Sequence, residues 1–175
     1  MNRRFAFFLF LPAVVLLLGA AVAIRAQDMP KLETNAGFDE LKSLAGEWQA
    51  TNAAGKPVHI TYVVVSNGSS LLERLHPTAE FEMVTMYSPD GNRVAATHYC
   101  NAGNQPQMRT EPLSGTPQKF SFQFVRSTNL ASPGAGHMRK LVIRIQDRDH
   151  FTQEWTWVEG GKPPHAEVFH FTRQS

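Results

Sequence analysis

The stretch KLVIRIQDRDHFTQEWTW, residues Lys140–Trp157, decides the fold, because apolar residues recur at alternate positions on both sides of a short polar break. A period of two is typical of β-strands that bury one face. The break at 147–149 has the length of a hairpin turn. One register joins the inner faces of the two strands, in the pairs Ile145–Phe151, Ile143–Gln153 and Leu141–Trp155. The stretch is therefore predicted to be an antiparallel hairpin.

Similar short segments fill most of the chain, separated at near-even intervals by turn-forming Gly, Pro, Asn and Asp. The expected strands are Trp48–Thr51, Val58–Val65, Leu71–His76, Phe81–Tyr87, Arg93–Cys100, Gln107–Leu113, Phe120–Arg126, Lys140–Asp147, Phe151–Val158 and Ala166–Arg173. This pattern predicts an all-β fold, an antiparallel barrel or sandwich of about ten strands. A barrel of this strand number can enclose one small ligand.

A second hairpin is expected at Ser88-Pro89-Asp90-Gly91, which suits a type I turn followed by a glycine in the left-handed region. That turn pairs residues whose numbers sum to 180 in the flanking strands. Glu82 then faces His98, and Cys100 lies one step further along the same inner face. Met83, Thr85 and Tyr87, among others, are expected on the outer face.

The N-terminal part is predicted to be a targeting segment. Arg3 and Arg4 precede a long apolar run that ends in small residues, which is typical of a signal peptide at 1–26. An uncleaved membrane anchor is the alternative. A linker at 27–37 then leads to a short helix over Phe38–Leu44 and one barrel domain at 38–175.

Charge and cysteine content exclude some functions. The full chain has a formal net charge of +2, but three of its 17 basic residues and none of its 15 acidic ones lie before residue 27. The mature domain is therefore slightly acidic, and no charge argument favours nucleic-acid binding. The single cysteine, Cys100, excludes an intramolecular disulfide. After signal cleavage we expect no stable membrane span.

The expected helix, the motif Leu44-Ala45-Gly46-Glu47-Trp48 and the strands behind it together resemble the lipocalin-like (calycin) superfamily. In that superfamily a Gly-x-Trp motif begins the first strand, and its tryptophan closes one end of the barrel. The resemblance implies this role for Trp48. The segments Thr97–Met108, Gly136–Met138 and His150–Trp157 are similar to exported bacterial proteins of unknown function in the superfamily. Haem-binding nitrobindin-type barrels are more distantly similar, and no histidine here matches their iron ligand.

His98 and Cys100 are the first candidates for chemistry, because side chains two apart on a strand share a face. They could act as base and nucleophile, or hold a soft metal together with Met108 and His137. The alternative for Cys100 is a plain buried side chain. The parallel side chains and the lack of a recognisable oxyanion-stabilising element argue against catalysis. We predict no catalytic residues and no cofactor, with haem or a soft metal as the alternative.

The remaining candidates are side chains that could line a pocket or its rim. Glu73 shares a face with Leu71 and Leu75, although an inward Leu72 would turn it outward. Gln153 would be the single polar group on an apolar inner face, so it either bonds to the backbone or points at a ligand. The predicted ligand-binding set is Glu73, Glu82, His98, Cys100, Gln105, Arg109, His137, Gln153 and Trp155.

The sequence thus favours an exported lipocalin-like barrel that binds a small, partly apolar molecule in its interior. The alternatives are a hydrolase or isomerase that uses His98 and Cys100, a haem or metal protein, and a filled structural barrel at the cell envelope.

Overall fold

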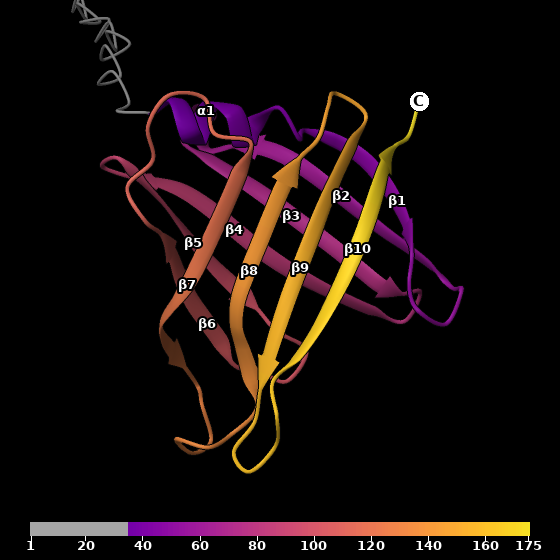
Figure 1. Cartoon of the computed structure of the whole chain (residues 1–175), viewed down its shortest axis with the longest axis vertical. Coiled ribbons are helices and arrows are strands. Elements are labelled where there is room, and N and C mark those ends of the chain that lie inside the picture. The colour runs from indigo at the N-terminus through magenta and orange to yellow at the C-terminus, as the bar shows by residue number, and fades with distance from the viewer. Residues whose placement is uncertain (1–34) are drawn as a thin grey trace, which may run out of the picture. The chain divides into compact units, whose positions relative to one another are not determined.

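The computed structural model describes residues 35–175, which form a closed antiparallel barrel of ten strands with one short α-helix (Figure 1). The predicted signal peptide and residues 27–34 of the predicted linker lie outside the described residues. The helix is α1 (Ala36–Lys42), and a 3-10 turn, η1, covers Ser66–Gly68. The strands are β1 (Gly46–Thr51), β2 (Pro57–Val65), β3 (Ser70–Thr78), β4 (Phe81–Asp90), β5 (Arg93–Tyr99), β6 (Gln105–Thr110), β7 (Lys119–Thr128), β8 (His137–Ile145), β9 (His150–Val158) and β10 (His165–Arg173). All ten expected strands are confirmed, with ends that differ by a few residues.

The strands follow an up-and-down order, in which each strand pairs with the next and β10 returns to β1. The closing joint is short. Only two residue pairs connect β1 to β10, Trp48 with Arg173 and Gln49 with Thr172, whereas β9 and β10 share eight. Both pairs lie at the end of the barrel that carries α1 (Figure 1). Toward the opposite end, β1 and β10 are not paired with each other in the described chain.

Helix α1 begins at Ala36 and ends at Lys42, two residues earlier at each end than the sequence pattern predicts. Asn35 causes the early start, because its side-chain oxygen accepts the Phe38 N–H at 2.7 Å and caps the first turn. The Asn35 amide also donates to the carbonyls of Gly91 and Arg93 at 2.8 and 2.9 Å. One residue therefore caps the helix and attaches it to the β4–β5 turn.

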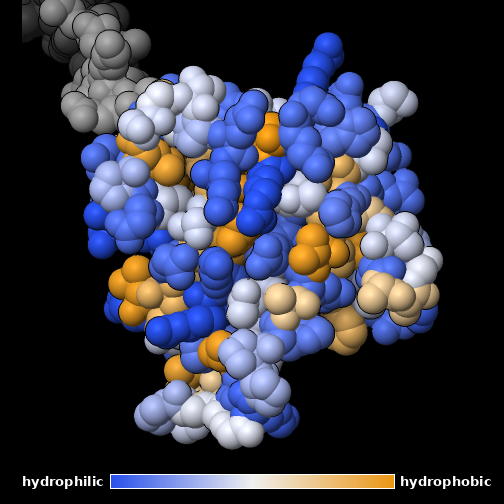
Figure 2. Space-filling model, viewed as in Figure 1, coloured by the Kyte–Doolittle hydropathy of each residue, from blue (hydrophilic) through white to orange (hydrophobic). Residues whose placement is uncertain are grey.

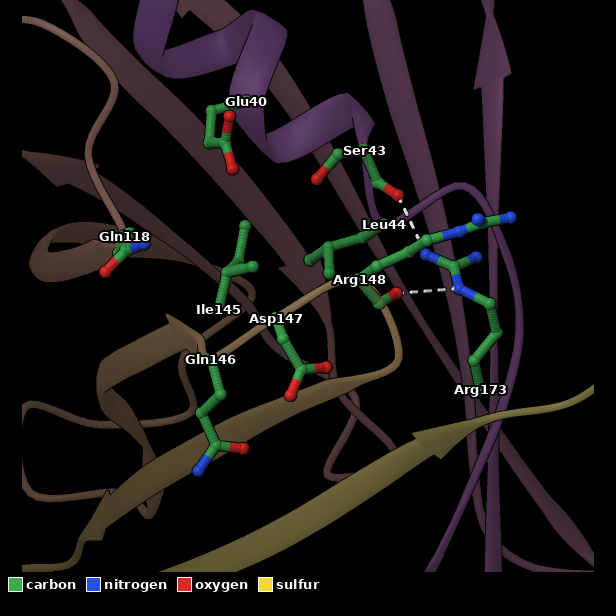
Figure 3. Close-up of a pocket in the computed structure, with 9 residues that line it drawn as sticks. All are labelled: Glu40, Ser43, Leu44, Gln118, Ile145, Gln146, Asp147, Arg148 and Arg173. Atoms are coloured by element: carbon green, nitrogen blue, oxygen red, sulfur yellow. Dashed lines mark hydrogen bonds between the residues drawn. The ribbon is translucent and has the colours of Figure 1, made fainter.

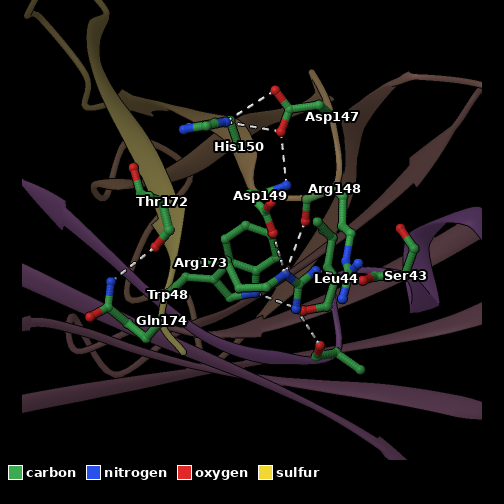
Figure 4. A network of polar contacts seen from close by, with 11 residues as sticks. Ser43, Leu44, Trp48, Asp147, Arg148, Asp149, His150, Thr172, Arg173 and Gln174 are labelled. Atoms are coloured by element: carbon green, nitrogen blue, oxygen red, sulfur yellow. Dashed lines mark hydrogen bonds and ion pairs between the residues drawn. The ribbon is translucent and has the colours of Figure 1, made fainter.

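Trp48 closes the α1 end of the barrel. Its indole N–H donates to the Leu44 carbonyl at 2.7 Å, and its ring meets Phe151 edge-on. The guanidinium of Arg173 lies over the Trp48 ring, 3.9 Å from its centroid (Figure 4). Arg173 also donates to the carbonyls of Ser43, Ala45 and Arg148 at 3.0, 2.8 and 2.9 Å. One side chain thus joins the helix end, the β8–β9 turn and the last strand.

The β8–β9 hairpin has the predicted register. Ile145 pairs with Phe151, Ile143 with Gln153 and Leu141 with Trp155. The inward residues of this hairpin are buried, and its outer face carries an ion pair between Arg144 and Glu154 at 3.4 Å.

The predicted β4–β5 register is wrong. The strands are joined by the two-residue loop Gly91-Asn92, so Asp90 pairs with Arg93 and paired numbers sum to 183. Gly91 takes the left-handed φ of 59° at the first loop position, whereas the prediction placed it after a longer turn. An odd change of register turns one strand over relative to the other. Thr85 therefore faces His98, and Glu82 points outward.

The barrel interior is filled mainly by large apolar side chains. The fully buried ones include Trp48, Phe120, Phe122, Phe151 and Phe171. On the face of the molecule seen in Figure 2, hydrophilic side chains prevail and hydrophobic ones are scattered among them. Val125 on β7 and Val168 on β10 are among the exposed hydrophobic residues. Among residues 35–175, no helix is long and apolar enough to cross a membrane.

Candidate binding site inside the barrel

A buried carboxylate lies in the middle of the barrel. Glu73 on β3 has no exposed surface. Its Oε2 accepts hydrogen bonds from the Tyr62 hydroxyl at 2.7 Å, the Tyr87 hydroxyl at 2.6 Å and the Gln153 amide at 2.8 Å. Its Oε1 accepts from the Thr85 hydroxyl at 3.1 Å. Four donors from three strands, β2, β4 and β9, therefore converge on one acidic side chain that has no cationic partner within this set.

Burial and hydrogen bonding act in opposite directions on Glu73. Burial raises the pKa of its carboxyl, while the bonds from Tyr87, Tyr62, Thr85 and Gln153 lower that pKa. Burial, followed by the adjacent Glu73 charge, raises the pKa of both tyrosines well above the ordinary value. Both hydroxyls are therefore protonated at neutral pH and act as donors to the carboxylate.

His98 extends this network toward the end of the barrel opposite α1. Its Nδ1 lies 2.9 Å from the Thr85 hydroxyl oxygen, and its ring packs on Trp155 with centroids 4.5 Å apart. Because the single Thr85 proton is donated to Glu73, the His98 Nδ1 carries a proton and donates to Thr85. Burial lowers the pKa of His98 to about 4, so the ring is neutral at pH 7 and its Nε2 bears a lone pair.

That Nε2 atom is buried and has no hydrogen-bond partner within the described part of the chain. Two residues before and after His98, the buried residues on the same face are small, namely Ala96 in β5 and Cys100 just after it. Such a buried acceptor is uncommon in folded proteins and requires an explanation. It is the feature of the interior that is best suited to receive a donor from another molecule.

The structure brings together four of the nine predicted site residues. Glu73, His98 and Gln153 belong to the hydrogen-bonded network, and Trp155 completes it by donating its indole N–H to Gln153 at 2.9 Å. Gln153 is bonded to side chains rather than to the backbone. Cys100 is buried at the end of the same inner face, its Sγ 3.6 Å from the Asn101 side-chain oxygen. Burial raises the pKa of the Cys100 thiol.

The other four predicted residues lie apart from this network. Glu82 is on the outer face, in contact with Arg74 and His76 at 3.6 and 3.7 Å. Arg109 is also on the outer face, and pairs with Asp90 at 3.1 Å.

Gln105 and His137 lie near the end opposite α1. Gln105 bonds to Gly103 and Thr128 at 3.0 and 2.8 Å. His137 is buried beside Phe124, and its Nε2 is another buried atom without a partner in residues 35–175.

Sequence reasoning missed Tyr62, Thr85 and Tyr87. The alternation of Val58, Ile60 and Tyr62 predicts that Tyr62 points inward, because it shares a strand face with two aliphatic residues that are typical of a barrel interior. Thr85 and Tyr87 were assigned to the outer face by the wrong hairpin register, so a correct turn assignment would have placed both beside His98.

Open recesses occur at the ends of the barrel and on its outer surface. The recess beside α1 has a volume of about 290 Å³ and lies between the helix end at Ser43, the β8–β9 turn at Arg148 and Arg173 (Figure 3). Another, of about 270 Å³, lies at the opposite end. The walls of both are formed by residues other than the Glu73–His98 network. Within residues 35–175, no group of three or more His, Cys, Asp or Glu side chains is arranged to hold a metal ion.

The fold and this network define a closed, ten-stranded antiparallel barrel with a polar centre. No family model matches the sequence, and no curated protein matches it. The barrel is similar to the crystal structure of Rv2717c from M. tuberculosis, with a TM-score of 0.54 and 14% sequence identity. The match covers 79% of this chain and 98% of that chain. At this identity the likeness shows the fold alone.

Proposed function

We propose that the protein is a lipocalin-like barrel that binds a small, partly apolar molecule carrying a hydrogen-bond donor, next to His98. One observation carries the proposal, which is that the His98 Nε2 lone pair is buried without a partner in residues 35–175. An unsatisfied buried acceptor costs about 1–3 kcal/mol. A ligand N–H or O–H would remove that cost and gain a directed hydrogen bond.

The surroundings of His98 support a ligand with an apolar body. The imidazole packs on Trp155, and the buried residues two positions before and after His98 are Ala96 and Cys100. Behind the imidazole, Thr85 and Glu73 hold the ring in one orientation and one tautomer. Sites of this kind combine an apolar lining with a few fixed polar groups. The raised pKa of Cys100 argues against the alternative in which His98 activates a thiolate nucleophile.

Access is proposed through the end of the barrel opposite α1. His98 is the penultimate residue of β5, on the side away from the helix. The β1–β10 joint consists of two residue pairs near α1. Toward the opposite end, β1 and β10 are not paired with each other in the described chain, so they can separate there while the joint near α1 stays intact.

Phenol and anisole test the proposal, because they differ in one O–H donor. Phenol is expected to raise the unfolding temperature of the wild type more than anisole does. His98→Phe keeps a ring against Trp155 but removes the lone pair, so it should weaken phenol binding about tenfold. His170→Phe, on the exposed outer face of β10, is the matched control. Equal stabilisation of wild type and His98→Phe by phenol would exclude this site. Native mass spectrometry of protein purified from its own cells would then show whether any molecule co-purifies.

We also propose that the mature protein is exported and begins near Gln27, since the arginine-flanked apolar run precedes that position. The intact mass of the exported form tests this. Recovery of the full-length chain in the membrane fraction would contradict it.

A further inference from the structure

A second recess, independent of His98, lies among the loops at the end opposite α1. It has a volume of about 270 Å³. Its walls come from the loops that follow β5, β7 and β9 and from Trp157 near the end of β9. The loops after β7 and β9 lie at the lower edge of Figure 1. Neither lysine nor arginine contributes to the described wall, whereas two asparagines, a glutamate and a tryptophan do.

Both asparagines turn their amide nitrogens toward the backbone. Asn104 Nδ2 donates to the Gly136 carbonyl at 2.9 Å, and Asn129 Nδ2 donates to the Gly103 carbonyl at 2.6 Å. These bonds fix the amide orientations, so that each side chain has its carbonyl oxygen left to accept. Asn104 is only 4% exposed, and its Oδ1 has no partner among the described residues. A buried amide oxygen of this kind favours a donor from a ligand.

Glu159 contributes a carboxylate to the same wall. Its carboxylate pairs with Lys162 at 3.0 Å, and that hydrogen bond is the main cause that lowers the pKa of Glu159. The carboxylate is therefore ionised at neutral pH.

The fourth wall residue, Trp157, supplies an aromatic surface. Its ring lies directly against Gly136, where an added Cβ would approach a ring carbon to 2.2 Å. The glycine therefore allows the indole to line the recess.

We propose that this recess binds an organic ammonium ion, the protonated form of a primary amine. An –NH₃⁺ group has three N–H donors, and three of the residues that line the recess carry side-chain oxygens, namely Asn104, Asn129 and Glu159. The indole of Trp157 provides the aromatic surface that attracts organic cations.

The wall chemistry separates this ligand class from two others. A hard divalent cation prefers six or more oxygen ligands, often from several carboxylates, and the wall has one carboxylate. An anion would meet the side-chain oxygens of two asparagines and a carboxylate that is already paired with Lys162. A neutral apolar molecule would leave the Asn104 oxygen without a partner.

Phenethylamine, which is protonated at neutral pH, is the probe, and 2-phenylethanol is its neutral analogue. Titrations followed by side-chain amide NMR should show saturable shifts of Asn104 and Asn129 with phenethylamine, at a dissociation constant of about 1 mM or below. Asn129→Gly removes one acceptor and keeps the left-handed backbone, since Asn129 has φ of 52°. Glu159→Gln removes the charge. Each variant should weaken phenethylamine binding about tenfold.

Two matched variants control for general effects. Asn67→Gly alters an asparagine with a nearly equal φ of 53°, located in η1 at the α1 end of the barrel. Glu167→Gln alters an exposed glutamate on β10. Both should bind phenethylamine as the wild type does.

Three results would overturn the proposal. The first is the absence of saturable shifts with phenethylamine. The second is equal binding of 2-phenylethanol, which would show a merely apolar recess. The third is Ca²⁺ binding that shifts the same amides and displaces the amine, which would identify a metal site. His98→Phe should leave phenethylamine binding unchanged, so the outcome is independent of the interior site.

Discussion

Replacing Glu73 tests the central network most directly. In Glu73→Ala, the Tyr87 hydroxyl loses the acceptor that it meets at 2.6 Å. The Tyr62 hydroxyl and the Gln153 amide nitrogen keep their mutual contact at 3.2 Å, the Gln153 oxygen keeps the bond from Trp155, and Thr85 keeps His98. A stranded buried donor costs about 1–3 kcal/mol, and the truncated side chain leaves a cavity at further cost. We expect a total loss of about 3–5 kcal/mol, a large share of the stability of an ordinary domain.

Glu73→Gln should behave very differently, because an amide can occupy the same space. Three donors converge on Oε2, so the new amide oxygen must take that position, and its –NH₂ must replace Oε1. The –NH₂ then donates to Thr85, and the Thr85 hydroxyl turns to donate to His98 Nδ1. We therefore predict a stability change within about 1 kcal/mol and a change of the His98 tautomer, with its proton moved to Nε2.

Urea unfolding measures the first effect, and the imidazole ¹⁵N shifts of His98 report the second, since protonated and unprotonated ring nitrogens are well separated. Glu167→Ala on exposed β10 is the control, expected to change stability by about half a kcal/mol. The reasoning is refuted if Glu73→Ala costs no more than this control. It is equally refuted if His98 keeps its proton on Nδ1 in Glu73→Gln.

Three further outcomes follow from the geometry. Burial lowers the pKa of His98 from 6.5 to about 4, so the unfolded state binds the proton more tightly than the folded state does. The free energy of unfolding should therefore fall by up to about 3 kcal/mol as the pH falls from 6.5 toward 4. Urea unfolding of His98→Phe across this range should lack that loss. Arg173→Ala should destabilise the barrel by about 2–4 kcal/mol, and a thermal unfolding temperature equal to wild type would contradict this. Cys100 should react slowly with thiol reagents in the native state and rapidly in urea. Glu82→Ala, on the outer face, should change the free energy of unfolding by only about half a kcal/mol.

Two hairpin registers were predicted from the sequence, and the one that depended on the turn assignment is wrong. In β8–β9, alternating apolar residues on both strands allowed one register to bury every large side chain, and that register is confirmed. In β4–β5, both faces of β4 contain apolar residues, Met83 and Tyr87 on one and Val84 and Met86 on the other. Alternation could not choose between them, and the turn assignment decided the register. The helix start depended on Asn35, whose capping role needs its contact with a turn more than fifty residues away.

The interior network was only partly predictable for a related reason. Glu73 and Gln153 stand out as polar residues in apolar strands. Their partners Tyr62, Thr85 and Tyr87 are ordinary strand residues, and only the closed barrel brings them to the same point. The orphan acceptor of His98 is a property of three strands together and has no counterpart in local sequence.

The short β1–β10 joint has a consequence for how the chain folds. The bonds from Arg173 to Ala45 and Ser43 connect residues 128 and 130 positions apart. They cannot form on the ribosome until almost the whole barrel sequence has emerged. Until then, β1 presents an open strand edge beside an uncovered apolar interior, a state that invites pairing with other chains. Ring closure is thus the last step of assembly, and local contacts cannot hasten it. The same joint should be the first to separate, so its amides should exchange with solvent earlier than those of β8 and β9.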